Sequence, residues 1–188
     1  MPKVKFGLSR AAIAVRTDND GTITYAEPID IPGAVSAAVE RESDTSIFYA
    51  DNTAYFTSNT KTSSTIDLEV ADIPREVLTA ILGYIEANGG GILETSNPVT
   101  PHFALLFEIQ TDEKARRFCY YNCTAVESDE EYNTTEDTIE PTTSTLSITS
   151  TGDPVGEYSA FRQIVDSTDA NYNTFFESVT APKEKAEE

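Results

Sequence analysis

The stretch Phe48-Tyr49-Ala50-Asp51-Asn52-Thr53-Ala54-Tyr55-Phe56-Thr57-Ser58-Asn59 places one pair of aromatic residues before an Asp-Asn dipeptide and a second pair after it. Asp and Asn tolerate the tight backbone of a turn, so this order predicts two strands joined by a turn at Asp51 and Asn52. Aromatic side chains in so polar a segment are poorly placed for the chain's own core. They are well placed to contact another copy of the protein. The stretch therefore points to assembly rather than to chemistry.

On both sides of this stretch, apolar and polar residues alternate with the period of two that is typical of β-strands. An Asp-Asn-Asp-Gly sequence at 18–21 predicts a hairpin turn, and a second turn falls at 111–114. The acidic, threonine-rich segment 127–143 indicates an exposed, mobile loop. The strands are expected at 13–25 (as a hairpin), 35–40, 65–70, 101–110, 115–126, 146–148 and 158–165.

The period changes to four at Ile73, Val77, Ile81 and Ile85, which predicts an amphipathic helix over 74–85 that lies on a sheet. Asp72 is its expected cap, and the three glycines at 89–91 are expected to stop it. A shorter helix is expected at 172–179. These elements predict a mainly β (α+β) fold in one domain, residues 1–180, with one flanking helix. Residues 181–188 carry no apolar anchor beyond alanine and are expected to be a disordered tail.

The chain of 188 residues has 32 acidic and 13 basic side chains, for a net charge of −19. Nine acidic residues and no basic residue lie between 118 and 161, most densely at 127–131. Such a protein repels nucleic acid rather than binding it. The charge fits a solubilising surface, or a surface that nucleic acid passes without adhering, and does not decide between the two.

No pattern of residues marks a catalytic or metal site. The chain lacks a Gly-x-Ser-x-Gly elbow and a phosphate-binding glycine loop, and its carboxylates carry no local signature. His102 is the only histidine, so a zinc site is not indicated. Cys119 and Cys123 are expected on one face of a strand, about 13 Å apart and too distant for a disulfide. We therefore predict no enzyme activity, no cofactor and no metal.

Seven segments together resemble the major tail proteins of long-tailed, non-contractile bacteriophages (siphoviruses), most closely the branch found in phages of Gram-positive hosts. The similarity is collinear over residues 3–150. The segments are Lys3-Val4-Lys5-Phe6-Gly7-Leu8, Thr24-Tyr25-Ala26-Glu27-Pro28, Ile31-Pro32-Gly33-Ala34-Val35, the Phe48 to Asn59 stretch, Leu68-Glu69-Val70-Ala71-Asp72-Ile73-Pro74, Phe103-Ala104-Leu105-Leu106-Phe107-Glu108 and Tyr121-Asn122-Cys123-Thr124-Ala125.

The resemblance implies a β-sandwich with a flanking helix and a long protruding hairpin. Such subunits form hexameric rings that stack head to tail into the tail tube. Tape-measure protein and then double-stranded DNA pass through the lumen without specific binding. Tail-terminator and baseplate or distal tail proteins would contact the two ends. The protein would be a virion component made in the host cytoplasm, with no membrane partner.

Transferred to this sequence, the resemblance assigns two contact regions. A hairpin around 44–61 would reach a neighbouring subunit or ring, through Phe48, Tyr49, Asp51, Tyr55 and Phe56. An acidic loop at 127–140 would contact the next ring, through Glu127, Asp129, Glu130 and Glu131.

Other functions remain open from the sequence alone. A stand-alone β-sandwich binding module, carbohydrate-binding or adhesin-like, could stack sugars on Tyr49, Tyr55, Tyr120 and Tyr132. Another tail or head component of the virion is a further alternative. A glycosidase is the alternative that the sequence favours least. Self-association into rings or tubes would separate a tube subunit from a monomeric sugar-binding module.

Overall fold

Long antiparallel strands make up most of the computed structural model, which describes residues 4–128 and 142–184. The predicted mainly β fold is confirmed. In chain order the elements are β1 (Lys5–Asn19), β2 (Thr22–Tyr25), β3 (Ile29–Ile31), β4 (Ala34–Ala50), β5 (Thr53–Val70), α1 (Arg75–Ile81), β6 (Ile85–Glu86), β7 (Ile92–Leu93), β8 (Phe103–Thr111), β9 (Arg116–Glu127), β10 (Ser144–Ser150), β11 (Asp153–Val155), β12 (Tyr158–Ala160) and β13 (Arg162–Val165).

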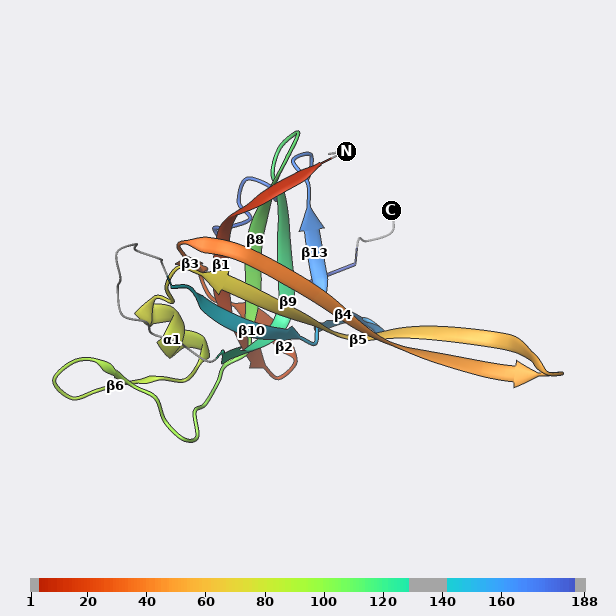
Figure 1. The fold of residues 1–188 in the computed structure, drawn as a ribbon, viewed down its shortest axis with the longest axis horizontal. Helices are drawn as coiled ribbons and strands as arrows, with labels where there is room; N and C mark the ends of the chain where they lie inside the picture. Colours follow the sequence, from red (N-terminus) through yellow and green to blue (C-terminus); the bar gives the residue numbers. More distant parts are fainter. Residues whose placement is uncertain (1–3, 129–141, 185–188) are drawn as a thin grey trace, which may run out of the picture.

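Nine of these strands form one hydrogen-bonded sheet in the order β2-β1-β8-β9-β10-β5-β4, with β13 added to β9 and β3 added to β1. The sheet does not stay flat. Figure 1 shows β4, β5 and β10 running across β1, β8 and β13, so that the sheet covers itself in two crossing layers. The predicted hairpins through 18–21 and 111–114 are both present, and the segment 158–165 forms two strands instead of one.

The bend of the sheet coincides with a β-bulge at Asn122. Leu105 pairs with Tyr120 but Phe103 pairs with Cys123, so β9 carries one extra residue, and Asn122 has a φ of 51°. Its side-chain amide donates to the carbonyl oxygen of Gly152 at 2.9 Å. A bulge bends a strand and resets its alternation. After it, β9 continues along β10 and enters the second layer, which is that of β4, β5 and β10.

The same bulge makes one prediction wrong. Cys119 and Cys123 were expected on one face of the strand, yet Cys119 packs with Tyr121 in one apolar cluster and Cys123 packs with Tyr120 in the other. The alternation that sequence spacing assumes fails where a residue is inserted. Both cysteines are buried and free.

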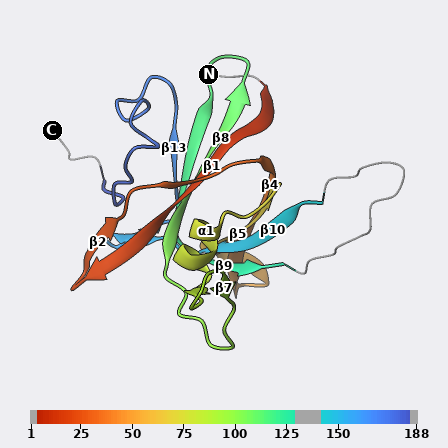
Figure 2. The ribbon, with the colours of Figure 1, turned by 90° about the vertical axis from the view of Figure 1, so that its left-hand side faces the viewer.

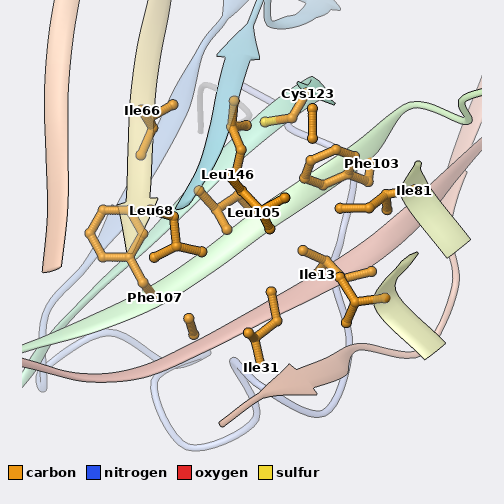
Figure 3. Packing of buried hydrophobic residues seen from close by; sticks show 14 of the residues in the cluster. Ile13, Ile31, Ile66, Leu68, Ile81, Phe103, Leu105, Phe107, Cys123 and Leu146 are labelled. Atoms are coloured by element: carbon orange, nitrogen blue, oxygen red, sulfur yellow. The ribbon is translucent and has the colours of Figure 1, made fainter. Parts of the chain in front are cut away.

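The main core fills the space between the two layers. Figure 3 shows Leu105 of β8 at the centre, with Leu68 of β5 and Leu146 of β10 beside it and Ile81 of α1 at one edge. These side chains are fully buried, and each contributes roughly 1.5–3 kcal/mol of transfer free energy. The core thus ties the first layer, the second layer and the helix together.

A second apolar cluster covers the opposite face of β1, β8 and β9. It combines Ala12, Leu106 and Tyr121 from the sheet with Val165 and Phe175 from the C-terminal part. Figure 2 shows the coil after β13 on the side of the sheet away from β10. The predicted helix at 172–179 is wrong, because this coil consists of successive turns. Its Asp, Asn, Ser and Thr residues favour such turns by bonding to nearby backbone.

The C-terminal coil also borders a half-open pocket of about 450 Å³ beside the second cluster. Ala181, Pro182 and Lys183, the first residues of the predicted tail, line it together with Cys119 and Tyr121. Residues 185–188 of that tail lie outside the described residues. The disorder of the tail stays a prediction.

Helix α1 is shorter than the predicted 74–85. It starts at Arg75 with Pro74 as its N-cap, within one residue of the predicted start, but the predicted cap Asp72 and the predicted C-terminal end are wrong. It ends at Ile81, and Gly83 follows with a φ of 73°. A Cβ at Gly83 would lie 2.7 Å from the carbonyl oxygen of Val99, so the chain turns here where only glycine fits. The glycines at 89–91 form the turn between β6 and β7. Asp72 accepts a bond from the Ile73 N–H and does not cap the helix.

We predict that Gly83→Ala destabilises the protein by at least about 1 kcal/mol more than Gly89→Ala. Both glycines have a positive φ, so both substitutions cost the left-handed strain of about 1–2 kcal/mol. A Cβ at Gly89 meets open space, whereas one at Gly83 meets backbone. Urea unfolding of the two variants measures the difference. Equal losses would show that the contact with Val99 does not constrain the helix end.

Two cysteine thiols and two tyrosine hydroxyls, which are buried or partly buried, are expected to make the protein less stable at alkaline pH. Burial raises the pKa of the Cys123 thiol to about 12 and also raises the pKa of Cys119, Tyr25 and Tyr121. In the unfolded chain these groups titrate near 8.5 for Cys and 10 for Tyr. The folded state therefore holds more protons than the unfolded state above about pH 8.5, and its stability is full below that pH and falls as the pH rises.

Urea unfolding between pH 7 and 11 tests this linkage. The double variant Cys119→Ala/Cys123→Ala is expected to be less stable at pH 7 but to lose less free energy per pH unit between 8.5 and 10. A wild-type stability that stays constant up to pH 11 would contradict the expectation.

Candidate assembly interface

Strands β4 and β5 form a hairpin that leaves the body of the protein. They pair along their whole length, from Ala34 opposite Val70 to Ala50 opposite Thr53. β5 also pairs with β10, but only from Ser64 to Val70. Beyond that point the hairpin is a two-stranded ribbon, and Figure 1 shows it extending far past the other strands. We call residues 41–63 the arm.

The arm ends in the predicted two-residue turn. Asp51 and Asn52 have φ values of 52° and 59°, and Ala50 and Thr53 pair directly across them. Two successive left-handed residues give a type I′ turn, whose twist matches that of the flanking strands. The Thr53 hydroxyl adds a bond to the Ala50 carbonyl oxygen at 3.0 Å. Asp51 therefore lies at the tip of the arm.

Large apolar side chains are exposed near this tip. The exposed fraction is 76% for Tyr55, 61% for Phe48 and 60% for Phe56, and Phe48 lies directly opposite Phe56. Ile47 and Tyr49 are exposed beside them. A clustered apolar surface of this kind marks a protein contact, and a two-stranded ribbon is only marginally stable alone. The structure thus brings the five predicted contact residues together, and it adds Ile47.

The outward face of β4, β5 and β10 is acidic and rich in hydroxyl groups. Glu40 and Glu42 on β4 and Asp67 and Glu69 on β5 alternate with the residues that pack on the core. Hydroxyl groups on the same face donate hydrogen bonds to these carboxylates. Ser63 donates to Glu42 at 2.7 Å, and Ser147 donates to Asp67 at 2.9 Å.

Glu69 on this face has two hydroxyl donors of its own. Thr143 donates to one carboxylate oxygen at 2.7 Å and Ser36 to the other at 2.9 Å. Both hydrogen bonds lower the pKa of Glu69, and the bond from Thr143 has the larger effect. None of the four acids forms an ion pair with a cation of the described residues. The face therefore keeps its negative charge.

The predicted acidic loop is only partly described. Glu127 is the last residue of β9, and it accepts a hydrogen bond from the Tyr84 hydroxyl at 2.7 Å. Asp129, Glu130 and Glu131 lie outside the described residues. Contact between rings through this loop stays a prediction.

Asp153 is the only carboxylate that is fully buried in the described part of the chain. It accepts a bond from the Arg16 guanidinium at 2.8 Å and another from the Tyr25 hydroxyl. These contacts join β11 to β1 and β2. Because both carboxylate oxygens are occupied by fixed donors, the group serves as a structural ion pair that anchors the β1–β2 hairpin.

The other residues considered for chemistry are dispersed. His102 is exposed, whereas Cys119 and Cys123 are buried. Within 4–128 and 142–184, no group of three or more His, Cys, Asp or Glu side chains could hold a metal ion. No helix in these ranges has the length and apolar character to span a membrane.

The tyrosines considered for sugar stacking do not form one surface. Tyr120 is 1% exposed and lies in the core, so its assignment to a sugar site is wrong. Tyr132 lies outside the described residues. Tyr49 and Tyr55 are exposed, but they belong to the arm.

Comparison with known proteins agrees with an assembly role. No curated protein matches the chain. A family model described as phage tail tube protein matches residues 16–181, which include the arm, every strand from β2 to β13 and most of the C-terminal coil. Because this match covers most of the chain, the protein belongs to the phage tail tube protein family.

Proposed function

We propose that this protein is the repeating subunit of a phage tail tube, in which copies close into hexameric rings and the rings stack head to tail. The arm is the observation that carries the proposal. It holds five large apolar side chains in solvent, on the part of the ribbon beyond the last pair of β5 with β10. A partner surface would cover them, and a tube supplies such a surface on a neighbouring copy.

Ring closure would also resolve an exposed sheet edge. Among the described residues, β4 hydrogen-bonds to β5 alone, so its other edge is open over a strand of 17 residues. Open edges of this length invite pairing with other chains, and a closed ring removes them. Contacts between different surfaces of identical copies generate rings. Six copies per ring is the number that the family resemblance implies.

We further propose that the acidic face of β4, β5 and β10 lines the lumen. Its carboxylates and hydroxyls offer no cation to hold a phosphate group, so double-stranded DNA would pass without specific binding. In this arrangement the tape-measure protein occupies the lumen before DNA, and tail-terminator and baseplate or distal tail proteins contact the ends. The subunit would act without catalysis, as a virion component made in the host cytoplasm.

Charging the arm should prevent assembly. We expect Phe48→Asp and Tyr55→Asp each to raise the protein concentration needed for tubes by about thirtyfold or more, as the loss of a contact worth about 2 kcal/mol requires. The monomers should keep their circular dichroism and urea midpoint, because both positions are exposed and outside the core. Negative-stain electron microscopy over a concentration series measures assembly.

The matched control is Tyr158→Asp. Tyr158 is an aromatic residue of β12 with an exposed fraction of 71%, and it lies outside the arm. This variant should form tubes like the wild type. Normal tubes from both arm variants would refute the role of the arm, and a loss of tubes in the control would show that any added charge prevents assembly.

A further inference from the structure

Three basic side chains from separate strands gather where the arm leaves the body. They are Arg41 of β4, Lys61 of β5 and Arg162 of β13. The Lys61 ammonium lies 4.4 Å from the centre of the Phe161 ring, and Arg162 donates to the Tyr120 hydroxyl at 3.4 Å. Partial burial lowers the pKa of Lys61, and repulsion by Arg162 and Arg41 lowers it further. We call these three residues the cationic cluster.

A bulge in β5 places Lys61 in this cluster. Glu42 pairs with Ser63 but Ser43 pairs with Lys61, so Thr62 is an extra residue. Because of it, Lys61 shares a face with Ser64 and Arg41, the face that packs on the core nearer the body. In a regular ladder, Lys61 would stand opposite Asp44 on the acidic face. The bulge therefore separates the cation from the acids of its own hairpin.

The cationic cluster lacks counter-ions among the residues that the structure describes. Five other arginines, namely Arg10, Arg16, Arg75, Arg116 and Arg117, each lie within ion-pair distance of a carboxylate. In the part of the chain that the structure describes, Arg41, Lys61 and Arg162 have no such partner. The hydroxyl of Ser64, opposite Arg41, is buried without a hydrogen-bond partner there. In a chain with 32 acids and 13 bases, three unpaired cations at one place are unexpected.

We propose that the cationic cluster binds carboxylates of a second copy of this chain in the assembled tube. The inference rests on the proposed function and deepens it by naming a polar contact in addition to the aromatic one. The cluster lies on the face of the ribbon that continues outward to Ile47, so one neighbouring copy can cover both. A copy with net charge −19 supplies many carboxylates and complements the cluster.

Nucleic acid fits this site less well than a second copy does. The opposite face of the same ribbon carries Glu40, Glu42 and Asp44, and the whole chain is strongly negative. A DNA duplex approaching the cluster would meet this field with its dense phosphate charge. A protein carboxylate is a single charge that can enter a pocket formed by a few cations.

Zero-length cross-linking tests the contact directly. Tubes are assembled from equal amounts of ¹⁴N- and ¹⁵N-labelled protein and treated with a carbodiimide, which joins a lysine amine to a touching carboxyl group with loss of water. Mass spectrometry should find Lys61 linked to an Asp or Glu in pairs of mixed isotope. The Lys61→Arg variant keeps the charge and should form tubes without this link. Tubes in which Lys61 forms no mixed-isotope link would overturn the inference and leave the proposed function standing.

Charge reversal gives an independent readout. Arg41→Glu/Lys61→Glu should raise the concentration needed for tubes at least tenfold. The control Lys5→Glu/Lys114→Glu changes the net charge equally at exposed residues outside the cluster and should shift it less than twofold. Equal behaviour of the two double variants would overturn the inference. So would normal tubes together with a loss of duplex DNA binding, which would identify a nucleic-acid site. A wild-type protein that never assembles would overturn the proposed function itself, and with it this inference.

Discussion

One constraint governs the structure: the β4–β5 ribbon continues past the core and the neighbouring strand that support its inner half. One face of this inner half points to the core. From Val70 to Ser64 that face packs on the core and is supported by β10. Beyond Ser64, β4 keeps its alternation and β5 is shifted by the extra residues Thr62 and Tyr55, but the ribbon has lost its neighbouring strand and its core. An unsupported ribbon that exposes large apolar groups is unfavourable alone. The arm therefore requires a partner.

The two faces of the ribbon suit two different roles in a tube subunit. The outward face is acidic and its carboxylates are held by hydroxyl groups, which suits a wall that DNA passes. The inward face carries Arg41 and Lys61 of the cationic cluster and then Ile47, which suits contact with a neighbour. Bulges keep the two faces distinct. The extra residue Thr62 moves Lys61 away from the acids, and the bulge at Asn122 turns β9 into the second layer.

Periodicity and turn chemistry predicted much of this fold. The Asp51-Asn52 turn, the hairpins and the acidic alternation of β5 follow from rules that act over a few residues. The errors arose where one residue or a distant contact decided the outcome. Gly83 ends α1 because the backbone at Val99 approaches it, and the coil at 172–179 covers a sheet with turns where its spacing suggested a helix. The exposed aromatics of the arm were predictable from composition, whereas the cationic cluster was not. Arg41, Lys61 and Arg162 meet only through the strand order and a bulge.

The most direct test of the account is cryo-electron microscopy of the protein at increasing concentration, at a resolution that traces the arm. We expect stacked rings in which Phe48 and Tyr55 of each copy are buried against a neighbouring copy and the acidic face of β4 and β5 points to the lumen. Tubes whose arms project freely into solvent would contradict it, as would a protein that stays monomeric at every concentration, even in the presence of tail-tip proteins that could initiate assembly.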